Sequence, residues 1–349
     1  MNLKQKNALN QRTRLPVNLT RMGFGSAPLG NLYRKIEDDD AQATIQAAWD
    51  AGIRYFDTAP QYGLGRSELR IGQGLARHDR DTLTLSTKAG RVLEDCALED
   101  VTPEAFVDVP QKRIVFDYTY DGIMRSVEDS SARLGIDTFD ILFLHDIDAG
   151  THGDAGVEDK LRELFDQGGY RALTELRDAG RITAIGAGVN TWQICERLLS
   201  EADFDGFLLA GRYTLLEQEP LDTFLPLCLK RDVGIILGGP YNSGILATGA
   251  VKGARYDYAP APEQILARVR KLEEVCAAHD TPLIAAALQF PLGHSAVKSV
   301  IPGASNPDEI RQNVKIFETP IPAVLWSDLK SQGLIRKDAP IPEETTDAS

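Results

Sequence analysis

Residues 54–63, RYFDTAPQYG, decide the fold expected for this chain. An apolar run of strand length ends at Asp57, and Tyr62 follows shortly after it. The same arrangement returns twice, because Lys88 follows the run TLTLST and His145 ends the run FDILFLH. In a parallel α/β barrel, the carboxyl ends of neighbouring strands meet at one mouth, where catalytic side chains gather. We therefore expect these four side chains to lie close together.

Short apolar runs alternate with helical periodicity along the whole chain. Eight of these runs indicate strands, at residues 22–26, 54–57, 82–88, 140–145, 183–187, 206–209, 234–237 and 299–302. Helical spacing of apolar residues is clearest over residues 265–276. Gly52 and Gly180 each end a helix before a strand, as a left-handed glycine does. With no GxGxxG after the first strand, the pattern predicts a single (β/α)₈ TIM barrel over residues 15–335.

Two connections in this barrel are longer than ordinary loops. They span residues 91–117 after the third expected strand and residues 146–168 after the fourth. Long loops in a compact domain are usually functional, and both follow strand carboxyl ends, so we expect them to overhang the mouth. The chain ends, residues 1–14 and 336–349, are polar or rich in Pro, Glu and Asp. We expect these ends to be flexible tails.

Composition narrows the class of protein. The chain has 349 residues, of which 43% are hydrophobic, and a formal net charge of −13. That charge argues against a nucleic-acid or anionic-membrane surface. The opening residues are polar and no apolar run approaches the length of a membrane span, so we expect no signal peptide and a cytoplasmic location. The four cysteines form no metal-binding pattern, which predicts reduced thiols and no metal. We expect a monomer or small homo-oligomer.

The four residue types at the expected mouth suit a proton-transfer site. Moving a hydride to or from a carbonyl carbon requires a proton at the oxygen, and Tyr62 can supply it. The pKa of a free tyrosine is about 10, and a neighbouring ammonium such as Lys88 lowers it. Asp57 can fix the position of Lys88, and the imidazole of His145 can hydrogen-bond the substrate oxygen.

The segments FDTAPQYGLGRSE, LSTKAG and LFLHD carry a resemblance to a known family. They resemble the aldo-keto reductases, which are (β/α)₈ barrels that use NAD(P)H without a Rossmann fold, and the similarity covers residues 20–318. The resemblance implies that Tyr62 is the general acid/base and that Lys88 lowers its pKa. It further implies that Asp57 pairs with Lys88 and that His145 orients the carbonyl or alcohol.

The same resemblance assigns a cofactor site. Residues 300–317 resemble the strand-eight loop and helix that hold the adenosine end of the dinucleotide, and residues 240–249 resemble the loop that wraps the pyrophosphate. Asn190 matches an asparagine beside the nicotinamide carboxamide. The residues expected to bind the cofactor are Gly25, Asn190, Tyr241, Asn242, Ser243, Gly244, Ile245, Gly303, Ser305, Arg311 and Asn313.

Departures from the family pattern bear on cofactor choice. Relatives that use NADP commonly carry a lysine at the position of Gly303 and an arginine at the position of Glu309. A glycine makes no ionic contact and a glutamate repels a phosphate, so we expect NAD. Arg311 on the same helix keeps NADP possible. The tyrosine that often stacks on the nicotinamide is replaced here by Gly238.

Residues 117–148 are similar to one branch of the family. That branch contains NAD-dependent aldose dehydrogenases (acting on L-fucose or D-threo-aldoses), L-galactose dehydrogenase and pyridoxal 4-dehydrogenase. The resemblance implies oxidation of the hemiacetal C1 hydroxyl of an aldose such as L-fucose, or of the pyridoxal hemiacetal, to a lactone. Two alternatives stay open: an NADPH-dependent reductase of small aldehydes and ketones, and a nucleotide-binding regulatory barrel without catalysis.

Overall fold

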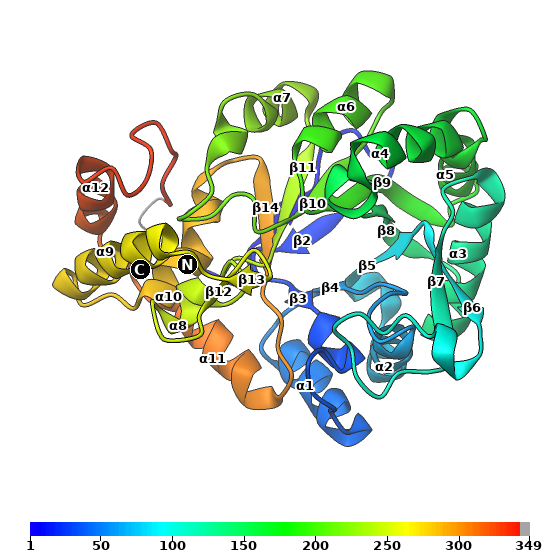
Figure 1. The fold of residues 1–349 in the computed structure, drawn as a ribbon, viewed down its shortest axis with the longest axis horizontal. Coiled ribbons are helices and arrows are strands. Elements are labelled where there is room, and N and C mark those ends of the chain that lie inside the picture. The colour runs from blue at the N-terminus through cyan, green and yellow to red at the C-terminus, as the bar shows by residue number, and fades with distance from the viewer. Residues whose placement is uncertain (343–349) are drawn as a thin grey trace.

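Eight parallel strands form the centre of the computed structural model, which describes residues 1–342 (Figure 1). Their order is β14-β11-β10-β9-β8-β5-β4-β3, and bridges between Met22 and Val300 and between Gly25 and Gly303 close the ring. The strands are β3 (Phe24–Gly25), β4 (Tyr55–Asp57), β5 (Thr84–Ala89), β8 (Phe139–His145), β9 (Ile182–Val189), β10 (Gly206–Ala210), β11 (Gly234–Gly238) and β14 (Val297–Ile301). The predicted eight-stranded barrel is confirmed.

Helices cover the outside of this barrel. They are α1 (Asp38–Asp50), α2 (Arg66–Leu75), α3 (Tyr120–Leu134), α4 (Ala149–Phe165), α5 (Gly169–Asp178), α6 (Gln193–Glu201), α7 (Phe224–Arg231), α8 (Ile245–Thr248), α9 (Glu263–Ala278), α10 (Leu283–Gln289), α11 (Pro307–Glu318) and α12 (Ala323–Ser331). Helix α3 shows how the sequence sets these elements. The Thr119 hydroxyl caps its first turn, Ile123 and Val127 face the core, and Gly135 ends it with a φ of 68°.

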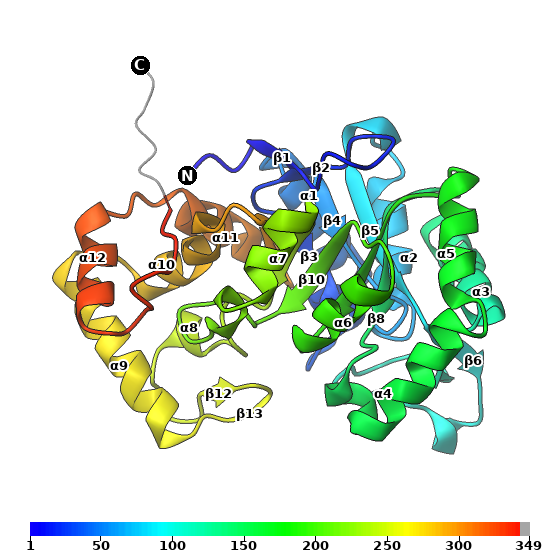
Figure 2. The ribbon, with the colours of Figure 1, turned by 90° about the horizontal axis from the view of Figure 1, so that it is seen from above.

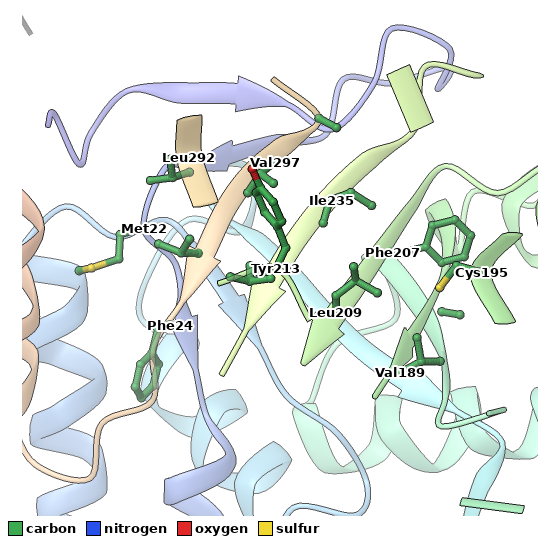
Figure 3. Close-up of a cluster of buried hydrophobic side chains, with 14 of the residues drawn as sticks. Met22, Phe24, Val189, Cys195, Phe207, Leu209, Tyr213, Ile235, Leu292 and Val297 are labelled. Atoms are coloured by element: carbon green, nitrogen blue, oxygen red, sulfur yellow. The ribbon is translucent and has the colours of Figure 1, made fainter. Parts of the chain in front are cut away.

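The core has two layers because strand side chains alternate between the inside and the outside of the barrel. The outer layer lies between strands and helices, and Figure 3 shows part of it, including Phe24, Leu209 and Ile235. The inner layer fills the barrel with Leu9, Val17, Leu19, Tyr55, Ile141, Phe143, Ala184, Leu208, Ile236 and Ile301. The barrel is therefore a packed core with a usable site only at its mouth.

The first residues of the chain close the floor of the barrel, whereas the sequence predicted a flexible tail over residues 1–14. Strand β1 (Lys6–Ala8) pairs with β2 (Asn18–Thr20), and this hairpin lies at the end opposite to the β12–β13 hairpin (Figure 2). Leu9 is fully buried. A Cβ on Gly206 would lie only 2.7 Å from the Leu9 side chain. The residues that pack here are single leucines between polar neighbours. Because the segment is polar on average, the sequence did not indicate this packing.

The expected carboxyl-terminal tail also packs in part. Arg336 N–H donates to Gln218 Oε1 at 2.7 Å, and Ala339 is fully buried. Residues 343–349 of that expected tail lie outside the described residues.

The two long connections differ from open loops. Residues 91–117 contain the antiparallel hairpin β6 (Arg91–Asp95) and β7 (Lys112–Phe116). Most of residues 146–168 is helix α4, because Asp148 caps it and Val157 and Leu161 bury on one face. A third connection, after β11, holds α8 and the hairpin β12 (Arg255–Tyr256) with β13 (Ala259–Pro260).

Candidate active site

Three neighbouring strands bring the four predicted catalytic side chains to one mouth. Asp57 ends β4, Lys88 lies near the end of β5, and His145 ends β8, which pairs with β5 in parallel register. Tyr62 follows β4 in the turn before α2. The four side chains therefore lie close together at the mouth of the barrel, as the sequence analysis expects.

Lys88 and Asp57 form a buried ion pair. Lys88 Nζ lies 2.7 Å from Asp57 Oδ2 and donates to the Thr58 carbonyl at 2.8 Å. Ser86 Oγ donates to the other carboxylate oxygen at 2.6 Å, so Asp57 has partners on both sides. Burial alone lowers the pKa of Lys88, but Asp57 and Tyr62 raise it, and the balance lies above the usual value. Lys88 is therefore a fixed ammonium group.

Tyr62 lies beside this ammonium, with Lys88 Nζ 4.8 Å from the centre of its ring. Two glycines fix the turn that carries it: Gly63 has a φ of 66°, and a Cβ there would lie 2.2 Å from the Gly30 carbonyl oxygen. Burial raises the pKa of Tyr62 above its ordinary value, and the charge of Lys88 opposes that rise. Lys88 thus acts in the predicted direction, but burial outweighs it.

His145 presents a neutral imidazole to the same space. Its ring is perpendicular to the Tyr62 ring, with the two centres 6.0 Å apart. Burial holds the pKa of His145 well below its usual value, and the charges of Arg91 and Lys88 lower it further. A neutral imidazole can donate one hydrogen bond and accept another, which suits it to orient an alcohol or a carbonyl.

A polar cluster that sequence reasoning missed adjoins His145. Asp146 Oδ2 lies 2.5 Å from Arg91 and 3.5 Å from His145 Nε2, while Asp146 Oδ1 accepts from Asn190 Nδ2 at 3.0 Å. Arg91 also pairs with Glu104 at 3.0 Å. Burial raises the pKa of Asp146 to about 6, against the opposing charge of Arg91. The sequence feature that could have indicated this cluster is the position of Asp146 directly after His145.

These groups line a cavity of about 340 Å³ at the mouth of the barrel. Its wall combines the charged and amide groups just described with apolar and aromatic surface. The lining residues outside those already named are Ala27, Leu32, Tyr33, Gln61, Ala105, Phe106, Thr151, Gly188, Val189, Leu208, Ala210 and Tyr258. The cavity therefore offers both polar and apolar surface beside Tyr62 and His145.

Tyr258 is a further residue that the sequence did not indicate. It lies in the turn of the β12–β13 hairpin and lines the cavity, and its hydroxyl is 3.4 Å from Asn190 Oδ1. Its backbone N–H donates to Ser243 Oγ at 2.9 Å. Arg212 anchors the same turn through Asp257 at 2.6 Å. The hairpin therefore reaches over the mouth from the side of β11.

The predicted pyrophosphate loop follows β11. Asn242, Ser243 and Gly244 all have left-handed backbone angles, which expose the backbone of a tight turn before Ile245 starts α8. Asn242 Oδ1 is buried without a partner among residues 1–342, and Ser243 helps line a small polar cavity. These features fit a bound dinucleotide. The Tyr241 hydroxyl donates to Asn313 Oδ1 on α11 at 3.4 Å.

The predicted adenosine segment lies after β14. Gly303 bridges to Gly25 of β3, and its carbonyl accepts from Asn313 Nδ2 at 3.3 Å. Ser305 N–H donates to Glu309 Oε2 at 2.7 Å. Arg311 points outward, since it pairs with Asp308 at 2.5 Å and its side chain is 65% exposed. Contacts thus join Gly25, Gly303 and Asn313, whereas the Arg311 side chain pairs with Asp308 instead.

The family model for the aldo/keto reductases matches residues 21–332. The chain belongs to the aldo/keto reductase family. Close similarity supports this assignment: the chain is 46% identical to pyridoxal 4-dehydrogenase of Microbacterium luteolum, over 96% of this chain and 100% of that protein. It is 40% identical to D-threo-aldose 1-dehydrogenase of a Pseudomonas species, over 90% and 94% of the two chains.

Solved structures agree with the fold of this aldo/keto reductase. The holo form of an aldo-keto reductase from Bacillus halodurans superposes with a TM-score of 0.74 at 25% identity, covering 97% of this chain and 98% of that one. Glycerol dehydrogenase from Gluconobacter oxydans gives 0.73 at 21% identity over both full chains. The protein is therefore an oxidoreductase enzyme of a family that binds nicotinamide cofactors.

Within residues 1–342, no helix has the length and apolar character needed to cross a membrane. Over that same range, no group of three or more His, Cys, Asp and Glu side chains is placed to hold a metal ion.

Proposed function

We propose that this enzyme oxidises the hemiacetal C1 hydroxyl of an aldose such as L-fucose, or of the pyridoxal hemiacetal, to a lactone with NAD⁺. The observation that carries the proposal is the contact set of Tyr62, Lys88, Asp57 and His145 beside one cavity. The relatives at 46% and 40% identity, whose names specify pyridoxal and D-threo-aldose, favour a cyclic hemiacetal substrate.

In the proposed mechanism, Tyr62 is the general base. Its phenolate takes the proton of the substrate hydroxyl and becomes a phenol; Lys88 Nζ, 4.8 Å from the ring centre, stabilises the phenolate that must be present before the step. Asp57 holds the ammonium in place, and the neutral imidazole of His145 orients the hydroxyl. The nicotinamide, when bound, accepts the hydride from the anomeric carbon.

The polar side of the cavity supports a substrate with several oxygen or nitrogen atoms. Arg91, Glu104 and Asp146 provide a donor and two acceptors a short distance from His145. A ring bearing hydroxyl groups, or the substituted pyridine ring of pyridoxal, can use such groups. Phe106, whose ring centre lies 6.2 Å from that of Tyr62, offers the opposite, apolar surface.

For the cofactor, we propose NAD held by Gly25, Asn190, residues 241–245, and Gly303, Ser305 and Asn313. Glu309 supports NAD over NADP, because its carboxylate faces Ser305 where a 2′-phosphate would be repelled. Asn190 Nδ2 donates to Asp146 and Asn190 Oδ1 accepts from Tyr258, so a second amide hydrogen and a second oxygen lone pair remain for the carboxamide.

The deciding experiment follows NADH formation at 340 nm with NAD⁺ and a panel of aldoses and pyridoxal. We expect turnover with L-fucose or pyridoxal, a lactone product by mass spectrometry, and at least about tenfold higher kcat/KM with NAD⁺ than with NADP⁺. NADPH consumption with small aldehydes, and no hemiacetal oxidation, would favour the reductase alternative. Dinucleotide binding without any turnover would favour a regulatory barrel.

A further inference from the structure

The segment that follows β3 closes directly onto the loop that follows β14. Gly25 bridges to Gly303, and Pro28 lies against Gly303 so closely that a Cβ there would be 2.9 Å from Pro28 Cγ. Contacts this short are tighter than ordinary packing, so a side chain at position 303 would push the two segments apart. A lysine or arginine side chain therefore cannot replace Gly303 without moving Pro28. With glycine at this position, the segment that follows β3 lies close to the loop that contains Ser305.

This approach places Arg34 at the predicted adenosine site. Arg34 donates to Ser305 Oγ and lies 3.5 Å from Glu309 Oε1. Glu309 in turn accepts from the Ser305 N–H at 2.7 Å and from Asn306 Nδ2 at 2.8 Å. One cation and one carboxylate thus share the same serine, and both remain accessible, with side chains 60% and 42% exposed.

Arg311, the cation that the sequence indicated for this role, is held elsewhere. Its guanidinium pairs with Asp308 at 2.5 Å on the outer surface of α11. Lys35, the neighbour of Arg34, pairs with Glu37 at 3.1 Å. Of these three cations, Arg34 is the one that contacts Ser305 and Glu309.

We propose that Arg34 and Glu309 together read the 2′ position of the adenosine ribose, and that Glu309 suppresses the affinity of Arg34 for a 2′-phosphate. The inference rests on the proposed cofactor site. A 2′-hydroxyl can donate to the Glu309 carboxylate, whereas a 2′-phosphate must compete with that carboxylate for Arg34 and for the Ser305 hydroxyl. Removing the charge of Glu309 should release Arg34 to bind phosphate, because a guanidinium forms strong charge-assisted hydrogen bonds with phosphate oxygens.

The test is a double-mutant cycle on dinucleotide affinity, measured by titration calorimetry without substrate. Dissociation constants for NAD⁺ and NADP⁺ are compared in the wild type, Glu309→Gln, Arg34→Gln and the double variant. We expect Glu309→Gln to tighten NADP⁺ binding about tenfold or more, because Arg34 is then free to form a charge-assisted hydrogen bond with the 2′-phosphate. NAD⁺ affinity should change only a few-fold. In the double variant the gain for NADP⁺ should disappear.

Arg311→Gln in the Glu309→Gln background is the matched control, and it should retain the gain. A gain that survives Arg34→Gln, or one that is lost with Arg311→Gln instead, would overturn the inference while leaving the proposed function intact. Equal NADP⁺ affinity in the wild type and in Glu309→Gln would also overturn the inference and leave the proposed function intact. A wild-type protein that binds neither dinucleotide would overturn both the inference and the proposed function.

Discussion

Lys88 Nζ lies 2.7 Å from Asp57 Oδ2, and the two side chains are 1% and 2% exposed. Removing one member of such a pair leaves an uncompensated charge in the core. We therefore expect Asp57→Asn to lower the free energy of unfolding by about 3–5 kcal/mol, measured by urea denaturation near pH 7. Lys35→Met breaks an ion pair whose side chains are 55% and 70% exposed, and it should cost at most about 1 kcal/mol. If the two variants lost equal free energies of unfolding, burial would not be the reason why the Lys88–Asp57 pair matters for stability.

Replacing the proposed base should remove chemistry and leave binding. Tyr62→Phe deletes only the phenolic oxygen, so kcat for hemiacetal oxidation should fall at least about 10²-fold, with an unchanged dissociation constant for the dinucleotide. Tyr170→Phe is the control, because its hydroxyl bonds the Asp203 carbonyl away from the cavity. A Tyr62→Phe enzyme that turns over at the wild-type rate would rule out the proposed role.

The pH–rate profile of oxidation should rise on the alkaline side, because the working base is a phenol. Burial raises the pKa of Tyr62 and Lys88 opposes the rise, so Lys88→Met should move the alkaline limb to higher pH or abolish activity. The limb is read from kcat/KM measured across the alkaline range. If an active Lys88→Met enzyme kept its limb in place, another group would be the one that titrates.

Asp146 should make stability depend on pH. Its pKa is raised from 3.8 to about 6 in the folded protein, so the folded state binds more protons than the unfolded state between those values. Stability from this group is then present at low pH and is lost as pH rises through that window. At about 1.4 kcal/mol per pKa unit, the loss is about 3 kcal/mol.

Asp146→Asn removes that dependence. The free energy of unfolding of the variant minus that of the wild type should therefore increase by about 3 kcal/mol between pH 4 and pH 7. Contacts that the asparagine cannot reproduce add an offset that does not depend on pH, so the slope of the difference is the quantity to measure. The exposed Asp159, replaced by Asn, should give a flat difference. A flat difference for Asp146→Asn would show that its carboxyl titrates normally.

Much of the barrel was predictable because strands buried on both faces leave continuous apolar runs, as residues 140–145 do. Asp57, Lys88 and His145 were predictable because each closes such a run, and Tyr62 because it follows Asp57 within a few residues. The floor hairpin was not, since Leu9 is one apolar residue among polar neighbours. Neither Tyr258 nor Arg34 could be placed, because each joins the site through contacts distant in sequence, to Asn190 and to Ser305. The helical spacing of Val157, Leu161 and Leu164 was sufficient to predict α4, in the segment for which the sequence analysis expects a long loop.

The hairpin under the barrel has a consequence for how the chain folds. Asn7 Nδ2 donates to the Lys298 carbonyl, a contact that joins residues 291 positions apart. The seam between β3 and β14 can form only when the last strand is available, so we expect β3 to keep an unpaired edge until then. Contacts this distant slow folding, and unpaired strand edges favour aggregation. We expect substitutions at Leu9, which is fully buried, to lower the yield of native protein as well as its stability once folded.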